Sequence, residues 1–285
     1  MNKKTENTSR RTFIKGAVAT FLTTPFLSPR VQANEFNAKS LQVWSCGGLA
    51  EAFIPANKRF EKKMGISIAY TGAFAAALGK SLLGSAETEV FAPRVLELSK
   101  KLRSTGKMLY FKPLCFSQYV VVTPKGNPAS IRSIQDLVRP GVRVVLAPQA
   151  SPPGGDAVNV IFKKAGIEEG VQKNTVIRSS CVQTMMDELI SRKGDASVVE
   201  LRLTRMERFA GKVDIISLPD QLQPASLLTF TIGVMKFAQD RELGDYYVNF
   251  ICSEEGQAFF EKAGFIPAIS EKGQKMIQSL GVKDV

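Results

Sequence analysis

A repeated order of strand, glycine turn and helix constrains the fold of this chain most strongly. The clearest copy lies in the middle of the sequence, where an apolar run at 142–146 leads through a Pro- and Gly-rich turn into a helical pattern at 157–165 that stops at Gly166. Two further copies begin with apolar runs at 40–46 and 66–71. Strands that alternate with helices build parallel sheets covered by helices. The sequence therefore predicts an α/β fold.

The turn at 147–157 also predicts a place for an anion. Its prolines restrict the backbone, and Gly154 and Gly155 allow the chain to fold tightly before the helix begins. The first turn of a helix has N–H groups without intrahelical partners and carries the positive end of the helix dipole. An ordinary loop of an α/β domain has the same local pattern, so both interpretations stay open.

Composition restricts the chemistry that this chain can perform. Its 285 residues, with 44% hydrophobic and 22% charged side chains, are typical of one large globular domain or two lobes. Beyond residue 33 there are 32 basic and 25 acidic residues, a net charge of +7 that favours an anionic ligand or merely aids solubility. Histidine is absent, which excludes Ser-His-Asp, Cys-His and His-bearing zinc sites. Basic clusters interleaved with aromatic residues are missing, so we expect no nucleic-acid partner.

Residues 1–33 predict a twin-arginine export signal. The segment 9–15, Ser-Arg-Arg-Thr-Phe-Ile-Lys, carries the arginine pair, a short apolar run follows at 16–27, and Val31-Gln32-Ala33 fits a cleavage site with small residues. An uncleaved basic anchor is the alternative. No later apolar run reaches the ~18 residues of a membrane span. We therefore expect a periplasmic protein that begins near Asn34.

The four cysteines would then lie in a compartment that permits disulfides. They are Cys46, Cys115, Cys181 and Cys252. Four cysteines allow three pairings, and their spacing favours none of them. Buried free thiols are the alternative interpretation.

Two strand-like runs, at 119–123 and 227–235, bracket the middle of the chain. We expect them to be crossover strands between two lobes, each a mostly parallel sheet flanked by helices. Lobe one would comprise 34–122 plus 228–285, and lobe two 123–227. A cleft between lobes is a favoured ligand site, and closure about a hinge is the expected motion.

Long amphipathic helices are predicted near both ends of the mature chain. One covers 49–63, where Pro55 either bends the helix or marks a later start. The other covers 239–263 and has an apolar stripe that contains most of its aromatic residues.

Four segments, in order along residues 40–270, carry a resemblance to a known family. Residues 84–92 resemble that family's Gly-x-x-Ala-Asp-Val-Phe-Ala segment, 120–128 its crossover strand, 153–155 its Pro-Ala-Gly helix start, and 253–265 its C-terminal helix. On these segments the chain resembles the periplasmic molybdate-binding proteins of ABC importers. The resemblance implies a type II, two-lobed periplasmic binding protein that uses no cofactor and performs no catalysis.

The resemblance also places a ligand site on this chain. The family holds a tetrahedral oxyanion with two serine hydroxyls, backbone N–H groups at helix starts and a tyrosine. The serines fall on Gly48 and Ala75, the backbone donors on Gly154 and Val182, and the tyrosine on Glu200. Both hydroxyl donors are thus missing, and a carboxylate replaces the phenol. A buried carboxylate repels a dianion unless it is protonated or paired.

Neighbouring residues offer substitutes for the missing donors. Ser45, three residues before Gly48, and Thr71, four residues before Ala75, could serve as hydroxyl donors. Arg94 and Arg202 could pair with Glu200 or with the anion. Glu200 at the rim of the protein is the alternative.

The cysteines near these positions suggest a second kind of site. Cys46 and Cys181 each flank an inferred ligand position, and with Glu200 they could bind a thiophilic metal or metalloid. A disulfide between them, or two unpaired buried thiols, are the other interpretations.

The sequence thus predicts the solute-binding component of an importer, a monomer that captures a molybdate- or tungstate-type oxyanion and delivers it to an ABC permease in the inner membrane. The alternative is a soft metal or metalloid binding or sensing protein. An enzyme is disfavoured because no nucleophile–base set is visible. The predicted ligand-binding residues are Ser45, Cys46, Gly48, Ala75, Gly154, Cys181, Val182 and Glu200.

Overall fold

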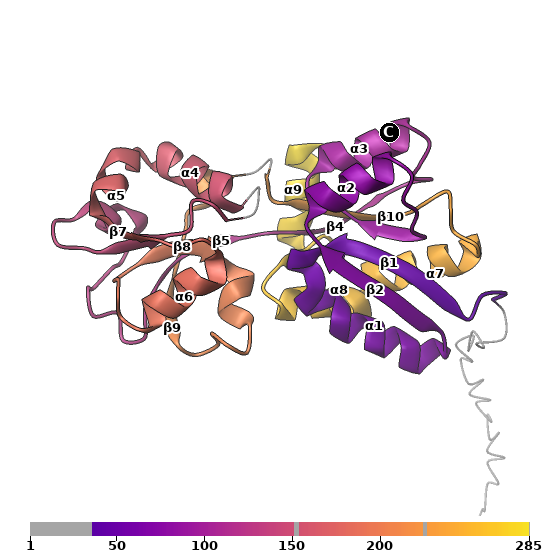
Figure 1. Cartoon of the computed structure of the whole chain (residues 1–285), viewed down its shortest axis with the longest axis horizontal. Coiled ribbons are helices and arrows are strands. Elements are labelled where there is room, and N and C mark those ends of the chain that lie inside the picture. Colours follow the sequence, from indigo (N-terminus) through magenta and orange to yellow (C-terminus); the bar gives the residue numbers. More distant parts are fainter. Residues whose placement is uncertain (1–35, 151–153, 225–226, 285) are drawn as a thin grey trace, which may run out of the picture. The chain divides into compact units, whose positions relative to one another are not determined.

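A computed structural model describes residues 36–150, 154–224 and 227–284, all of which belong to one compact unit. The predicted signal at 1–33 lies outside the described residues, as does part of the Pro-rich turn at 151–153. Helices and strands alternate along the chain, so the predicted α/β class is confirmed (Figure 1). Among the described residues, no helix has the length and apolar character that a membrane crossing needs.

The larger sheet has six strands in the order β11-β4-β10-β3-β1-β2. Its strands are β1 (Ser40–Cys46), β2 (Ser67–Ala73), β3 (Val90–Ala92), β4 (Lys112–Phe116), β10 (Thr229–Val234) and β11 (Ile266–Pro267). The strands β1, β2 and β3 pair in parallel, whereas β10 pairs antiparallel with both β3 and β4. The sheet is therefore mixed, and the expectation of mostly parallel sheets is wrong here. The chain leaves this sheet through β4 and returns to it through β10. Strand β10 therefore runs in the direction opposite to β4.

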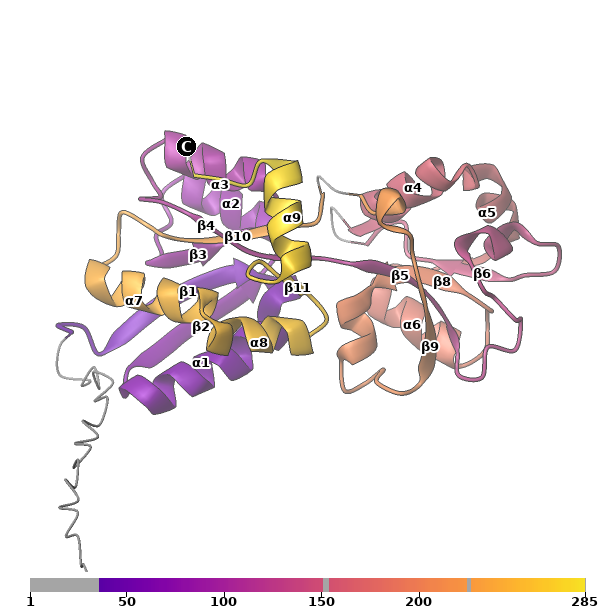
Figure 2. The same cartoon turned by 180° about the vertical axis from the view of Figure 1, so that it is seen from behind.

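Helices cover both faces of this sheet (Figures 1 and 2). The helices α1, α7 and α8 contact one another on one face, and α2 and α3 lie on the other. Their bounds are α1 Ala50–Met64, α2 Ala75–Leu83, α3 Leu96–Ser104, α7 Arg241–Cys252, α8 Glu254–Lys262 and α9 Glu271–Leu280, of which α9 packs on β4 and β11. Between α1 and α7, the rings of Phe60 and Tyr247 meet edge to face at 5.1 Å, and the Tyr247 hydroxyl donates to Asn57 at 2.6 Å.

The structure decides the two predictions of long amphipathic helices. Pro55 does not interrupt α1, which ends only at Gly65 in the left-handed conformation. The predicted single helix at 239–263 is wrong, because the chain breaks at Ser253 into α7 and α8. Ser253 caps α8 by accepting a hydrogen bond from the Gly256 N–H at 3.3 Å. The predictions also missed β4, β11, α9 and the short helix α5 (Glu168–Asn174).

The second group of strands is organised around β5 (Tyr119–Pro124). This strand pairs antiparallel with β8 (Ser197–Glu200) and β9 (Val213–Ser217), while β6 (Val144–Leu146) pairs in parallel with β7 (Thr175–Arg178). Every residue of β5 is buried, since helices cover both faces. Val120 and Val122 pack in the cluster beneath α6 (Val182–Ile190), whereas Val121 packs in the cluster beneath α4 (Gly154–Ala165). An uninterrupted apolar run is the expected sequence of such a strand.

The chain passes from the larger sheet to this second group through Ser117 and Gln118, between β4 and β5. The strand predicted at 119–123 as a crossover thus lies wholly in the second sheet, and β10 lies wholly in the first. The lobe boundaries at 122/123 and 227/228 stay a prediction.

Candidate functional site

The carboxyl ends of β1 and β2 bring two of the predicted positions to one edge of the larger sheet. The two strands are in register with Cys46 opposite Ala73. From there the chain enters a short 3-10 turn that contains Gly48 and then α1, while the other strand leads into α2, which begins at Ala75. Ser45 is fully buried and shares a hydrogen bond of 2.7 Å with the Tyr70 hydroxyl. Its hydroxyl therefore supports the strand ends and is not exposed to a ligand.

Glu200, the last residue of β8, is the centre of a buried polar cluster. Its Oε1 atom accepts hydrogen bonds from Arg94 Nη2 at 2.5 Å, the Tyr119 hydroxyl at 3.1 Å and the Ser117 hydroxyl at 3.4 Å. Its Oε2 atom accepts from Arg202 Nε at 2.6 Å. The side chains of Glu200 and Arg94 are each 7% exposed. Both oxygens are thus engaged by the protein itself, and Glu200 is not a rim residue.

Electrostatics keeps this carboxylate ionised. Burial alone would raise the pKa of Glu200, but the guanidinium groups of Arg94 and Arg202 lower that pKa to about 2. The same neighbourhood raises the pKa of Tyr119, first through burial and then through the charge of Glu200, so its hydroxyl stays a hydrogen-bond donor. A charged, fully bonded carboxylate therefore stands where the resemblance places a tyrosine.

Arg202 connects this cluster to the Gly48 turn. A Cβ atom built on Gly48 would lie 3.4 Å from the Cζ, Nε and Nη2 atoms of Arg202. Arg202 Nη1 lies 3.5 Å from Oε1 of Glu51 on α1. One Glu51 oxygen and the Nε atom of Arg94 are buried without a hydrogen-bond partner. The site therefore retains donor and acceptor capacity that the described residues do not use.

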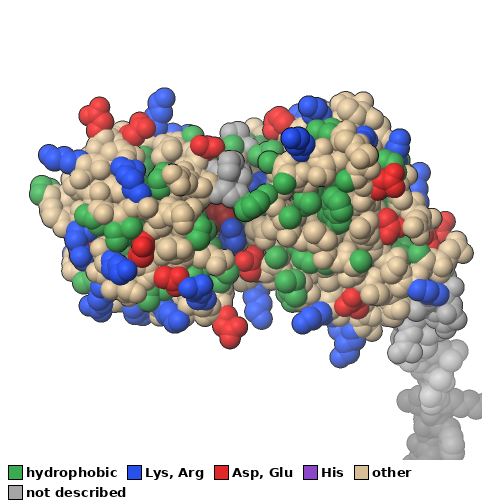
Figure 3. All heavy atoms as spheres, in the orientation of Figure 1, with side chains coloured by type: hydrophobic (Ala, Val, Ile, Leu, Met, Phe, Trp, Pro, Cys, Tyr) green, Lys and Arg blue, Asp and Glu red, His purple; other side chains and the backbone are tan. Residues whose placement is uncertain are grey.

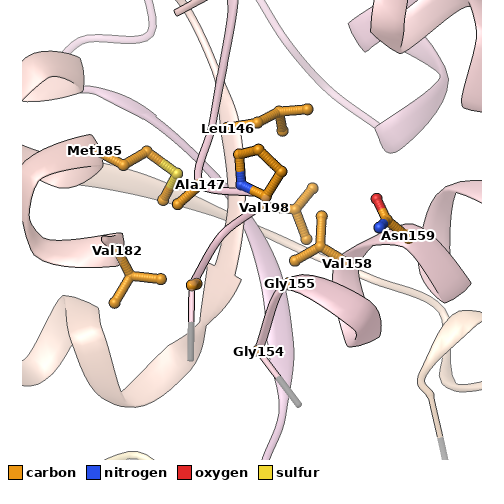
Figure 4. Close-up of a pocket in the computed structure, with 11 residues that line it drawn as sticks. Leu146, Ala147, Gly154, Gly155, Val158, Asn159, Val182, Met185 and Val198 are labelled. Atoms are coloured by element: carbon orange, nitrogen blue, oxygen red, sulfur yellow. The ribbon is translucent and has the colours of Figure 1, made fainter. Parts of the chain in front are cut away.

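The other two predicted positions meet in the second group of strands. Gly154 is the first residue of α4 and Val182 the first of α6, and both line one small cavity of about 20 Å³ (Figure 4). The cavity lies at the end of β6 and beside Val198 of β8, and Asn159 is the one polar side chain among its lining residues. The remaining lining residues are Leu146, Ala147, Pro148, Ala150, Gly155, Val158, Met185 and Val198. Polar contact at this place therefore comes from Asn159 and from the backbone of the two helix starts.

The two candidate cysteines have different surroundings. Cys46 is buried, and burial raises the pKa of its thiol, so the thiol is neutral at pH 7. Cys181 is exposed and caps α6; its sulfur lies 3.2 Å from the Thr184 hydroxyl and accepts from the Thr184 N–H at 3.4 Å, which lowers its pKa. All four cysteines are free in the described part of the chain.

These surroundings do not favour the soft-metal alternative. Both oxygens of Glu200 are already engaged, and one of the two thiols is buried and neutral. Within residues 36–150, 154–224 and 227–284, no group of three or more His, Cys, Asp or Glu side chains is placed to hold a metal ion. A disulfide between Cys46 and Cys181, one of the interpretations left open by the sequence, is not formed.

Several residues of the site were not predicted from the sequence. Ser117 and Tyr119 beside Glu200, and Tyr70 beside Ser45, carry no local signal that separates them from their neighbours. Glu51 does carry one, because it is an acidic residue in the first turn of a predicted helix, next to Gly48. Charged side chains elsewhere do not mark the site, since Figure 3 shows Lys and Arg interspersed with Asp and Glu over the visible face.

Comparison with known proteins gives the class of this α/β protein. The family described as bacterial extracellular solute-binding protein matches residues 41–266, so the chain belongs to that family. This is a family of transport proteins and not of enzymes. Its structural relatives are two-lobed, which agrees with the predicted fold class.

Three individual proteins that are similar to this chain are described as binding molybdate or as part of a molybdenum transporter. The molybdate-binding protein ModA of Mycobacterium tuberculosis is 26% identical over 255 residues, which cover 88% of this chain and 93% of the relative. The periplasmic molybdate-binding protein of Azotobacter vinelandii has a TM-score of 0.64 at 14% identity and covers 79% of this chain and 98% of its own. The substrate-binding domain assigned to a molybdenum ABC transporter of Clostridium difficile has a TM-score of 0.71 at 17% identity, covering 80% and 98%.

Proposed function

We propose that this protein is the extracytoplasmic receptor of an ABC importer, which captures a small oxyanion between its two lobes and delivers it to a permease in the inner membrane. The family membership and the 26% identity to a molybdate-binding protein support this role. The observation that carries the ligand class is the meeting of two helix starts, Gly154 and Val182, at one cavity. Helix N-termini favour anions through their free N–H groups and their dipole.

In this proposal the backbone holds the ligand. The N–H groups near Gly48 and Ala75 act from the larger sheet, and those of Gly154 and Val182 act from the second group of strands. The two cysteines and the Ser45 hydroxyl are not ligands, because Cys46 and Ser45 are buried and Cys181 caps its own helix. The receptor acts as a monomer and binds no nucleic acid.

A thermal-shift screen of the protein from Asn34 onward tests the ligand class. Molybdate and tungstate are the first probes because relatives bind molybdate, and sulfate is the next because a sulfate-binding protein of Synechococcus elongatus is 29% identical over 172 residues. A ligand at 100 times its Kd stabilises the folded state by about 2.7 kcal/mol. We expect a rise in melting temperature of roughly 5–10 °C. No rise with any oxyanion, together with a rise with a thiophilic metal ion, would show that the proposal is wrong.

Export by the twin-arginine route is a separate proposal. It rests on Arg10 and Arg11 and on the predicted cleavage after Ala33. Changing both arginines to lysine is expected to leave the precursor in the cytoplasm, whereas the wild type should yield a periplasmic protein that begins at Asn34. Cell fractionation with N-terminal sequencing measures both. Normal export of the double variant would refute this route.

A further inference from the structure

We propose that the guanidinium of Arg202 is the cation that contacts the ligand, in the place of the serine hydroxyl that Gly48 lacks. This inference rests on the proposed function, because it concerns the same site. It identifies Arg202 as a residue that determines specificity, and Glu200 as the residue that positions it. The geometry of three groups carries it: Gly48, Glu200 and Glu51.

The first observation is the position of the guanidinium over Gly48. The Cζ, Nε and Nη2 atoms all lie 3.4 Å from the place where a Cβ atom would stand on Gly48. The planar group thus lies along the space into which a serine side chain would extend. The absence of a side chain at Gly48 therefore leaves the space that the guanidinium of Arg202 occupies.

The second observation is that the guanidinium of Arg202 has one short contact, through Nε, and one long contact, through Nη1. Its Nε donates to Glu200 at 2.6 Å, and its side chain is 15% exposed. Nη1 lies 3.5 Å from Glu51, a long ion pair, and the side chain of Arg202 makes no further hydrogen bond within the described residues. Nη2 is thus without a partner among those residues, and Nη1 is held only by this long contact. The end of the guanidinium that carries Nη1 and Nη2 can donate two parallel hydrogen bonds to two oxygens of one anion.

Arg94 has a different role, although it touches the same carboxylate. Its Nη2 donates to Glu200 at 2.5 Å and reaches the Tyr119 hydroxyl and the Leu227 carbonyl at 3.4 Å. Its guanidinium also lies over the Phe230 ring at 5.3 Å. All three hydrogen bonds use Nη2, and the side chain is 7% exposed against 15% for Arg202. Arg94 therefore balances the charge of Glu200 from the interior, and Arg202 is the more accessible of the two cations.

Charge balance then defines the class of ligand. The two arginines and the carboxylates of Glu200 and Glu51 sum to zero, and Glu51 is the group held most loosely. An anion that offers two negatively charged oxygens replaces Glu51 at the open end of Arg202. Tetrahedral oxyanions and the carboxylate end of a small organic acid share this chemistry.

Titration calorimetry on the mature protein tests the inference. The probes are molybdate, sulfate, phosphate, lactate and malate, which separate inorganic oxyanions from organic acids. For the anion that the wild type binds, Arg202→Met is expected to lower affinity at least about tenfold, and Arg202→Lys by an intermediate factor because lysine keeps the charge but not the fork. Glu51→Gln should raise affinity severalfold, because it removes the competing carboxylate.

Arg205→Met is the matched control. Arg205 lies in the same 3-10 turn, Leu201–Arg205, and is exposed, so its removal changes the net charge equally without touching Glu200. The Arg205→Met protein should bind the anion with an affinity within about twofold of that of the wild type. If Arg202→Met proves unstable, the affinities of Arg202→Lys and Glu51→Gln test the inference instead. The first variant keeps the positive charge at position 202, and the second leaves Arg202 unchanged.

A second pair of variants tests whether serine and guanidinium fill the same place. Gly48→Ser in the Arg202→Met protein should recover part of the lost affinity, whereas Gly48→Ser alone should bring no gain. Unchanged affinity in Arg202→Met and Arg202→Lys, or a loss in Glu51→Gln, would overturn the inference while leaving the oxyanion receptor intact. Failure of the wild type to bind any of the five anions would instead remove the proposed function.

Discussion

Replacing Glu200 by glutamine is expected to lower the free energy of unfolding by about 3–5 kcal/mol. The change keeps the shape of the side chain but removes the charge that faces Arg94 and Arg202 at 2.5 and 2.6 Å. Two guanidinium groups, one of them 7% exposed, would then remain in the interior with only Glu51 as a distant anionic partner. For a protein of this size the melting temperature should fall by roughly 10 °C. Thermal and urea unfolding measure the loss.

Glu255→Gln is the control for this prediction. Glu255 also pairs with two cations, Arg59 at 2.5 Å and Lys63 at 3.0 Å, but all three side chains are about a third exposed or more. Exposed pairs contribute about 0–1 kcal/mol, because water and salt screen them. If Glu200→Gln and Glu255→Gln lower the free energy of unfolding equally, burial does not strengthen the ion pairs of Glu200.

The pH dependence of the unfolding free energy tests the same prediction in a second way. Since the folded protein lowers the pKa of Glu200 from 4.5 to about 2, its contribution to stability is fully present above pH ~4.5 and is lost as the pH falls toward 2. The difference in unfolding free energy between wild type and Glu200→Gln should therefore shrink steadily over that interval. A difference that stays constant between pH 5 and pH 3 would contradict the assignment of an ionised carboxylate.

Gly155→Ala is expected to destabilise the protein by about 1–3 kcal/mol and to weaken binding of the oxyanion about tenfold. A Cβ atom on Gly155 would lie 2.5 Å from the Pro148 carbonyl oxygen, a distance that forces α4 or the preceding turn to move. The Gly154 N–H, one of the proposed donors, would move with it. Thermal unfolding and titration calorimetry with the anion found in the screen measure both effects.

The adjacent glycine provides the control. On Gly154 a Cβ atom would lie 3.7 Å from the Ala150 Cβ, an ordinary contact. Gly154→Ala keeps the backbone N–H and gains helix propensity, so stability should be unchanged or slightly higher. If both alanine variants behave alike, the close approach of Gly155 to Pro148 does not position the helix start.

Much of the fold could be predicted because its signals are local. The run at 119–124 is strongly apolar and bounded by Pro124, and it forms β5. The helix predicted at 157–165 after the glycine turn forms as α4, but it begins three residues earlier, at Gly154. Where the signal was weak, prediction failed: β11 has only two residues, and the break at Ser253 depends on one cap inside a continuous apolar stripe.

The site was predictable only in part. The family resemblance assigned Gly48, Ala75, Gly154 and Val182 to the site, and this assignment stays a prediction. The structure puts Gly48 in the turn before α1 and the other three residues at the starts of helices. The pairing of Glu200 with Arg94 and Arg202 was one of two alternatives predicted from the sequence, and it is confirmed. The other partners, Ser117 and Tyr119, lie 83 and 81 residues away, so nothing in the local sequence selects them.

By itself the sequence determined the α/β class, the alternation that builds it, and the exclusion of histidine chemistry, because each depends on residue type and short-range spacing. The tertiary structure alone decided that Glu200 is ionised and fully bonded, and that Arg202 lies over Gly48. Those facts depend on the register of β5 with β8, which sets Tyr119 opposite Glu200, and on the close approach of α1 to the turn after β8. Charges become selective partners only when folding brings them together away from water, where their interaction is strong.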